Sequence, residues 1–291
     1  MHISSPSLLI LHLHLSIASA IQITPIHTFP PRIFIENIAI RSNSKILLTS
    51  MSTLTLSTIN PLVSPATVET VHTFPSELAT GLIGITESTP DIFAVTTGII
   101  DLANTRVTPG SLIVWTVDLR RIHRPPIIKR VTTVQNTTII NGITTLPTAP
   151  HILLAADSAA GTVWRINLQT GNSTIIFSDP LFKPVNATPG SNLGINGLQA
   201  AGQFLYFTNS AQGLFGRVPI SRGGEKTGDV QVLARPMREG LVYDDIAVDG
   251  EGNAWIATHP VDVVRIRGLE GKGGIKQETW GDSEVLLNPT A

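Results

Sequence analysis

The sequence predicts an all-β protein, a β-propeller built from repeats of about 50 residues. Short runs of Val, Ile, Leu and Thr alternate with turns that contain Gly and Pro, which is typical of strands joined by tight turns. No long stretch has helical periodicity. One motif recurs without gaps: Glu36–Ser50 aligns with Asp244–Thr258 as an acid, a polar residue, an apolar strand, a polar turn and a second strand. Four strands per repeat of this length indicate a propeller blade.

Five blade starts can be identified from this motif. They fall at Glu36, Gly81, Asn141, Asn196 and Asp244, so the spacings are 45, 60, 55 and 48 residues. We expect a six-bladed propeller in which the sixth blade is truncated, because only residues 285–291 follow as the start of another repeat. Alternatively, residues 21–30 close the ring in another way. A pair of β-sandwiches is less consistent with the sequence, because its strands would not carry matched polar positions at blade spacing.

The N-terminus predicts a secreted protein. An apolar run, Leu8–Ile17, precedes Ala18-Ser19-Ala20, which resembles a signal-peptidase site. We therefore expect a signal peptide over residues 1–20 and a propeller domain over residues 21–291, the alternative being a frayed N-terminal strand. Three N-x-S/T sequons predict glycosylation and support secretion: Asn136, Asn172 and Asn186.

The composition excludes several classes of function. Only 14% of residues are charged and the net charge is −1, so we expect neither nucleic acid nor a membrane as partner. Cysteine is absent, which excludes disulfides, thiolate nucleophiles and zinc–cysteine sites. The sequence contains no G-x-S-x-G elbow, P-loop, H-E-x-x-H or dinucleotide fingerprint. The abundant aliphatic residues suit an apolar small-molecule substrate, although they also suit an ordinary core.

A polar ring is predicted at the central pore. The innermost strand of each blade starts at the channel, so polar residues at equivalent repeat positions converge there. These are Glu36, Asn141, Asn196 and Asp244. Two carboxylates and two amide oxygens suit one divalent cation, such as Ca²⁺, Mg²⁺ or Mn²⁺. The alternative is that each residue caps a turn at the channel mouth.

A second set of polar residues follows at the ends of the next strands. Asp157, Asn209 and His259 occupy equivalent positions there, and capping of turns is again the alternative. His259 is the most interesting of them, because a neutral imidazole serves as ligand or base near neutral pH. Tyr243 and Asp245 flank the ring, and we expect them to line the pocket.

The blade starts, in this order and spacing, resemble the SMP-30/gluconolactonase/luciferin-regenerating-enzyme superfamily over about residues 26–291. The resemblance implies a six-bladed propeller in which a Glu, two Asn and an Asp hold one divalent metal that polarises a lactone carbonyl. The amino-acid sequence of the repeats is similar to that of a fungal secreted branch of this superfamily. That branch contains the hetero-Diels–Alderases of tropolone–sesquiterpenoid biosynthesis. The similarity is carried by Glu36–Asn43, by Asp157-Ser158, Gly161 and Trp164-Arg165, and by Ala257–Pro260.

Three functions therefore compete. The first is a pericyclase that joins an o-quinone methide to a humulene-type alkene, with His259 or Tyr243 as hydrogen-bond donor. The second is a lactonase that depends on a divalent metal, Zn²⁺ or Ca²⁺ among others, with Asp157 or Asp244 activating water. The third is a propeller that binds without catalysis. The order of the first two rests on the family resemblance and not on the residues.

Overall fold

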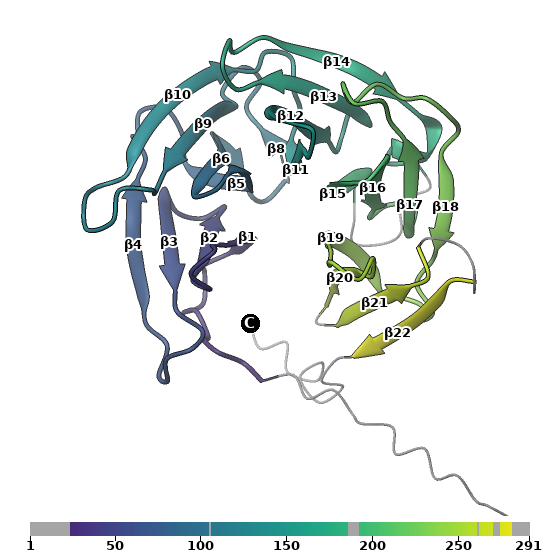
Figure 1. Cartoon of the computed structure of the whole chain (residues 1–291), viewed down its shortest axis with the longest axis horizontal. Coiled ribbons are helices and arrows are strands. Elements are labelled where there is room, and N and C mark those ends of the chain that lie inside the picture. Colours follow the sequence, from purple (N-terminus) through teal and green to yellow (C-terminus); the bar gives the residue numbers. More distant parts are fainter. Residues whose placement is uncertain (1–23, 105, 186–191, 261, 270–273, 281–291) are drawn as a thin grey trace, which may run out of the picture.

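The computed structural model describes residues 24–104, 106–185, 192–260, 262–269 and 274–280. Within these ranges the chain forms β-strands and one short 3₁₀ helix, η1 (Pro180–Phe182). Five four-stranded antiparallel sheets stand around a common centre, as Figure 1 shows. The all-β propeller predicted from the sequence is therefore confirmed, with five blades described.

Each blade is a simple up-and-down sheet. Blade one contains β1 (Ile35–Ile40), β2 (Ile46–Ser50), β3 (Thr55–Ile59) and β4 (Val68–Thr73). Blade two contains β5 (Gly81–Thr89), β6 (Ile92–Gly98), β9 (Ile113–Asp118) and β10 (Ile127–Thr133), and a small hairpin of β7 (Ile100–Asp101) and β8 (Arg106–Val107) interrupts it. Blade three contains β11 (Ile140–Leu146), β12 (Ala149–Asp157), β13 (Thr162–Asn167) and β14 (Ser173–Ser178).

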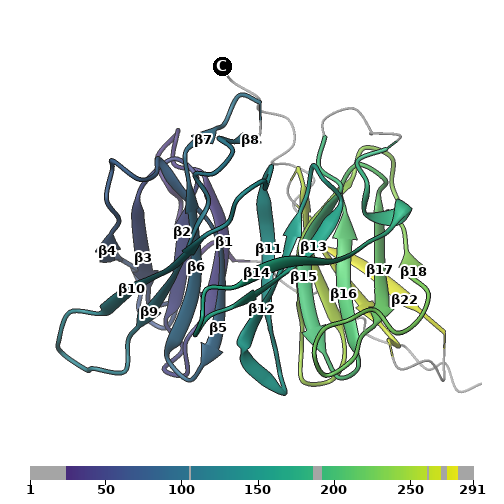
Figure 2. The same ribbon diagram turned by 90° about the horizontal axis from the view of Figure 1, so that it is seen from above.

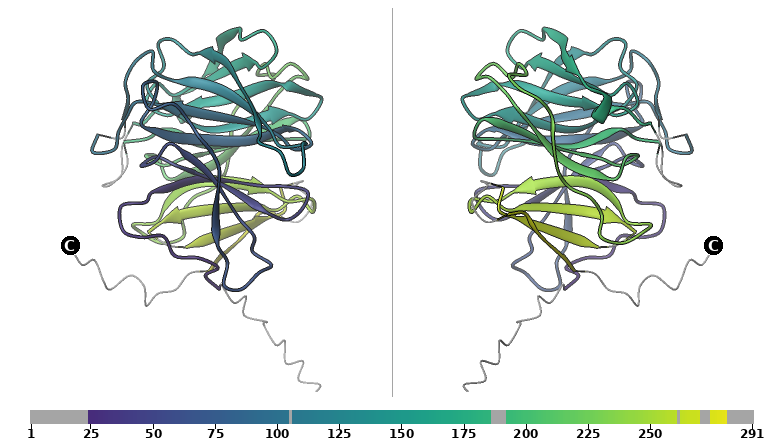
Figure 3. Two further views of the ribbon diagram at one scale, coloured as in Figure 1. Left: turned by 90° about the vertical axis from the view of Figure 1, so that its left-hand side faces the viewer. Right: turned by 90° about the vertical axis from the view of Figure 1, so that its right-hand side faces the viewer.

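The last two described blades repeat this arrangement. Blade four contains β15 (Ile195–Ala201), β16 (Phe204–Asn209), β17 (Leu214–Pro219) and β18 (Gln231–Ala234). Blade five contains β19 (Val242–Val248), β20 (Ala254–His259), β21 (Val263–Arg267) and β22 (Lys276–Trp280). The first strand of every blade lies nearest the centre (Figure 1), and the sheets stand side by side when the ring is viewed from its edge (Figures 2 and 3).

Four apolar clusters hold consecutive blades together. Each cluster fills the space between two neighbouring sheets with buried aliphatic and aromatic side chains, so burial of apolar surface stabilises the ring. The inner strands approach closely at glycine: a Cβ on Gly84 would lie 2.7 Å from the backbone oxygen of Asn141 in the next blade. Among the described residues, no such cluster joins blade five to blade one.

A sector between blade five and blade one contains no described strand (Figure 1). The sixth blade therefore stays a prediction, and residues 285–291, expected to begin it, lie outside the described residues. The expected signal peptide, residues 1–20, and the sequon asparagine Asn186 lie outside them as well. In the described part of the chain, no helix is long and apolar enough to cross a membrane.

Candidate functional site

A β-bulge in each inner strand sets the position of the polar ring. The register with the second strand shifts at Ile35/Ile38, Leu82/Ile85, Ile140/Ile143, Ile195/Leu198 and Tyr243/Ile246. A bulge adds one residue and redirects the side chains around it, which is why bulges recur at functional sites. The same place inside each bulge is occupied by Glu36, Ile83, Asn141, Asn196 and Asp244. Blade two therefore contributes fully buried Ile83, and the expected equivalence of Gly81 is wrong by two residues.

The four polar ring residues line one cavity at the centre of the propeller. It encloses about 180 Å³. Its polar lining consists of Glu36, Asn141, Asn196, Ser210, Asp244 and His259. Its apolar lining consists of Phe34, Met51, Leu193 and Val242. The sequence thus identified the polar lining residues except Ser210, whereas the apolar lining comes from residues at the strand ends or just beyond them.

Asp244 is the hub of the hydrogen bonds in this cavity. Its Oδ1 accepts from Nδ2 of Asn196 at 2.6 Å, and its Oδ2 lies 2.9 Å from Nε2 of His259. The hydrogen bond to Asp244 raises the pKa of His259 above its usual 6.5, because the carboxylate stabilises the imidazolium. The His259 side chain remains 58% exposed, so its imidazole can contact a ligand while it is hydrogen-bonded to the carboxylate.

Ser210 fixes the orientation of the Asn196 amide. The Ser210 hydroxyl donates to the Tyr243 carbonyl at 2.7 Å, and its Oγ accepts from Asn196 Nδ2 at 2.9 Å. Because a serine has one proton and a carbonyl can only accept, the Asn196 atom that faces Ser210 is the donor nitrogen. Sequence reasoning did not identify Ser210, although Ser158 stands at the matching place in blade three after Asp157.

Carboxyl groups crowd this end of the pore. Burial, followed by the charges of Asp244 and Asp245, raises the pKa of Glu36 from 4.5 to about 8, although a side-chain hydrogen bond from Asn141 partly offsets this. Burial also raises the pKa of Asp245 to about 7, and its Oδ1 accepts from its own neighbour, the Ile246 N–H, at 2.8 Å. Glu36 and Asp245 therefore change protonation state near neutral pH.

The oxygen atoms that line the cavity fit only part of what a site for a hard cation requires. Oδ1 of Asn196 is buried and has no hydrogen-bond partner, so an amide oxygen is left over beside the carboxylates of Glu36 and Asp244. Oxygen donors of this kind are the ones that Ca²⁺ and Mg²⁺ take. Among the described residues, however, no three His, Cys, Asp or Glu side chains are grouped as a metal site. Any cation would therefore depend on both amides.

Tyr243 is not part of the cavity wall, contrary to the sequence-based expectation. Its ring is fully buried between blades four and five, and its hydroxyl accepts from Nε2 of Gln277 at 2.8 Å. Burial raises the pKa of this phenol to about 12. Asp244 lies inside the bulge of β19 and faces the pore, whereas the side chain of Tyr243 packs into the apolar cluster between the two blades.

Asp157 and Asn209 have the structural role that was the alternative. Asp157 is fully buried and accepts from the backbone N–H of Thr138 at 3.0 Å, from the Thr138 hydroxyl and from the N–H of Ala160 at 3.3 Å. Asn209 donates to the carbonyls of Leu181 and Lys183. Neither side chain lines the central cavity, so of this second set the structure brings only His259 to the ring.

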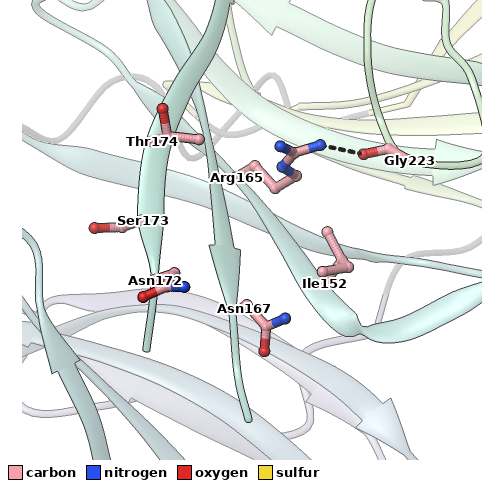
Figure 4. A pocket seen from close by; sticks show the side chains of 7 residues that line it. All are labelled: Ile152, Arg165, Asn167, Asn172, Ser173, Thr174 and Gly223. Carbon is pink, nitrogen blue, oxygen red and sulfur yellow. Dashed lines mark hydrogen bonds between the residues drawn. The ribbon is translucent and has the colours of Figure 1, made fainter. Parts of the chain in front are cut away.

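A larger cavity lies away from the pore, on the rim of blade three (Figure 4). It encloses about 320 Å³ beside Arg165, whose Nη1 donates to the Gly223 carbonyl at 3.4 Å. The sequon residues Asn172 and Thr174 lie along its edge on and beside β14. Asn172 and Asn136 are both exposed, as glycosylation would require.

No protein-family model matches the sequence. A protein of Sarocladium schorii, named for a proposed hetero-Diels-Alderase activity, is 25% identical over 249 residues. The alignment covers 77% of this chain and 60% of that relative, so the chain spans about three fifths of the relative's length. The likeness to it is distant, and the specific reaction does not follow from it.

Solved structures share the fold at low identity. A chain of the nidogen/laminin complex matches with a TM-score of 0.61 at 12% identity, covering 87% of this chain and 82% of its own. Regucalcin of Agrobacterium tumefaciens, a calcium-binding protein, matches with a TM-score of 0.54 at 17% identity, covering 85% and 75%. The chain is a β-propeller. Propellers support many functions, so what this one does must be argued from its cavity.

Proposed function

We propose that this chain is a pericyclase, which joins an o-quinone methide to an apolar alkene in a hetero-Diels–Alder reaction at the central cavity. The observation that carries the proposal is the His259–Asp244 pair on the wall of a cavity whose other side is apolar. The distant likeness to a protein named for the same reaction class supports the choice. No nucleophile is required, because the heterodiene and the alkene form one carbon–oxygen and one carbon–carbon bond at the expense of their π bonds, and no atom leaves.

His259 is the hydrogen-bond donor in this proposal. Negative charge grows on the oxygen of the heterodiene as the new bonds form, and a donor aimed at that oxygen stabilises the transition state. Asp244 orients the imidazole and stabilises its protonated form, and Asn196 in turn donates a hydrogen bond to Asp244 at 2.6 Å. The remaining rate enhancement comes from holding the two partners together, which is worth up to about 7–11 kcal/mol in favourable cases.

The size of the cavity limits what it holds. A volume of about 180 Å³ is below the roughly 300–1,000 Å³ of pockets that enclose drug-sized ligands. We therefore assign the oxygen-bearing ring of the heterodiene to the cavity. The alkene extends past the exposed side of His259, so the apolar residues Phe34 and Val242 contact the junction of the two partners.

The decisive experiment generates an o-quinone methide from a neutral precursor in the presence of humulene and purified protein. We expect a changed ratio of adduct stereoisomers relative to buffer, loss of that change in His259→Ala, and retention of it in Tyr243→Phe. A product ratio equal to that in buffer overturns the proposal.

A metal-dependent lactonase is the second candidate, favoured by the unpaired Oδ1 of Asn196 beside two carboxylates. A divalent cation bound there would polarise a lactone carbonyl. In that case Glu36, Asn141, Asn196 and Asp244 would bind it, while His259 would hold a proton beside the scissile ester. Stoichiometric Ca²⁺ or Zn²⁺, with lactone hydrolysis abolished by EDTA, would select this candidate. Failure of both assays would leave a propeller that binds without catalysis.

A further inference from the structure

A second cavity lies between blades four and five, at the end of the inner strands opposite the polar ring. It encloses about 500 Å³, which is within the roughly 300–1,000 Å³ of pockets that enclose small organic ligands. The turns that follow β15 and β19, at Gly202 and Asp249, form part of its wall. Asn196 and Asp244 lie near the starts of the same two strands, so about 17 Å of strand separates the two cavities. None of the described residues lines both of them.

Arg217 of β17 brings a fixed positive charge to this cavity. Its guanidinium lies over the ring of Phe204, with 4.2 Å between Cζ and the ring centroid. Nε donates to Oε1 of Gln231 at 2.9 Å, and Nη1 donates to the Leu269 carbonyl at 2.6 Å. In the described part of the chain, Nη2 has no hydrogen-bond acceptor. The contacts therefore hold the guanidinium in one orientation and leave N–H donors for a ligand.

The charge of Arg217 is less compensated than that of its counterparts in other blades. An arginine stands at the same register position of the third strand in three blades: Arg165, Arg217 and Arg265. Arg165 forms an ion pair with Glu225, and Arg265 forms one with Glu278, which lies opposite it in the sheet. The residue opposite Arg217 is the neutral Gln231, and no described carboxylate forms an ion pair with this arginine. Blade four therefore keeps a positive charge that a ligand can neutralise.

Tyr206 contributes a second donor to the cavity. Its side chain is only 5% exposed, and its ring centroid lies 6.0 Å from that of Phe204. Among the described residues, its hydroxyl has no hydrogen-bond partner. Buried hydroxyl groups normally have a partner, because leaving one unsatisfied costs free energy. A ligand that accepts a hydrogen bond from Tyr206 therefore gains from a group that the fold itself leaves unsatisfied.

Asp249 also lines the cavity, but its carboxylate is already occupied. Its Oδ2 accepts from Nε1 of Trp255 at 2.8 Å and from Nδ2 of Asn253 at 2.9 Å. Its Oδ1 accepts from the backbone N–H of Asn253 at 2.9 Å. Asp249 thus holds the turn between β19 and β20. Its negative charge nevertheless disfavours a ligand that carries more than one negative charge.

We propose that this cavity binds a small organic acid, a monocarboxylate with an apolar body. Arg217 and Tyr206 donate hydrogen bonds to the carboxylate oxygens, and Val248 and Leu269 contact the apolar body. A guanidinium is always charged, and its planar arrangement of donors matches a carboxylate. The site is independent of the reaction proposed at the pore, which uses residues at the other end of the strands.

Isothermal titration calorimetry of the full chain with 1-naphthylacetate tests the proposal, with the neutral 1-naphthylacetamide as the matched probe. We expect the acid to bind with a dissociation constant of about 0.1–1 mM, and the amide to bind about ten-fold more weakly. Gln231→Glu should weaken binding of the acid about ten-fold, because it gives Arg217 the ion pair that Glu278 gives its counterpart. Tyr206→Phe keeps the ring and should weaken binding about five-fold. Arg165→Gln, at the equivalent position in blade three, should leave binding unchanged.

Three outcomes overturn the proposal. The acid does not bind; or the acid and the amide bind with equal affinity; or Gln231→Glu and Tyr206→Phe both bind the acid as the parent protein does. In the last case, loss of binding in His259→Gln would assign the acid to the pore.

Discussion

Replacing Glu36 by Gln should change how the stability of the protein depends on pH. In the folded protein, burial and the charges of Asp244 and Asp245 raise the pKa of Glu36 from 4.5 to about 8. Between these two values, the folded state holds a proton that the unfolded state has released. The stability that this proton gives is fully present below pH 4.5 and is lost as the pH rises towards 8. Glutamine keeps the shape of the protonated side chain and removes the titration.

The expected size follows from the shift. One pKa unit corresponds to 1.36 kcal/mol, so a carboxyl that stays protonated over the three units from pH 5 to pH 8 is linked to about 4 kcal/mol. Glu36 is half-buried, so we reduce this to about 2–3 kcal/mol for solvent screening. Glu36→Gln should therefore match the parent protein at pH 5 and exceed its free energy of unfolding by about this amount at pH 8.

The assay is urea unfolding at pH 5, 6.5 and 8, followed by the fluorescence of the four tryptophans and run in EDTA so that no cation contributes. Glu77→Gln, at an exposed carboxylate, is the matched control and should leave the pH dependence unchanged. Some pH dependence should survive in Glu36→Gln, because Asp245 also has a raised pKa, of about 7.

One result would refute the reasoning. If Glu36→Gln changes stability by the same amount at pH 5 and pH 8, Glu36 does not titrate between these values. The crowding of carboxyl groups in the pore would then have no energetic consequence.

Three further predictions concern the other candidate residues. Tyr243→Phe should lower the free energy of unfolding by about 1 kcal/mol and leave turnover unchanged, because its hydroxyl serves only Gln277; a large loss of turnover with normal stability would return Tyr243 to the site. Asp157→Ala should destabilise the protein by about 3 kcal/mol, measured by urea unfolding, because it leaves the buried N–H of Ile139 and the N–H of Thr138 without their acceptor; a change below about 1 kcal/mol would remove that structural role. His259→Gln should lower the catalysed rate by about 100-fold without unfolding the protein. Catalysis by the parent protein should require the protonated imidazole, so its activity should persist above pH 6.5 and then fall as the pH rises further, which initial rates across pH 5–9 would check.

Much of the fold could be predicted from the sequence because the blades repeat. Each blade has the same order of apolar strand, turn and second strand. The sequence alone therefore aligns Asn141 with Asn196. The inner strands carry a bulge, however, and a bulge breaks the alternation from which the facing of side chains is predicted. That is why the sequence chose Gly81 where the register gives Ile83, and why it could not separate Asp244 from its neighbour Tyr243.

The roles of Asp157 and His259 depend on contacts that the repeat does not encode. The two residues end equivalent strands, β12 and β20, and the sequence therefore treated them alike. The loop before β11 places the Thr138 N–H against Asp157. The carboxylate of Asp157 therefore accepts hydrogen bonds from the backbone and does not face the pore. At the end of β20, the imidazole of His259 instead contacts Asp244 across the blade. A polar residue at a repeat position can thus serve a turn or the pore, and only the loops decide which.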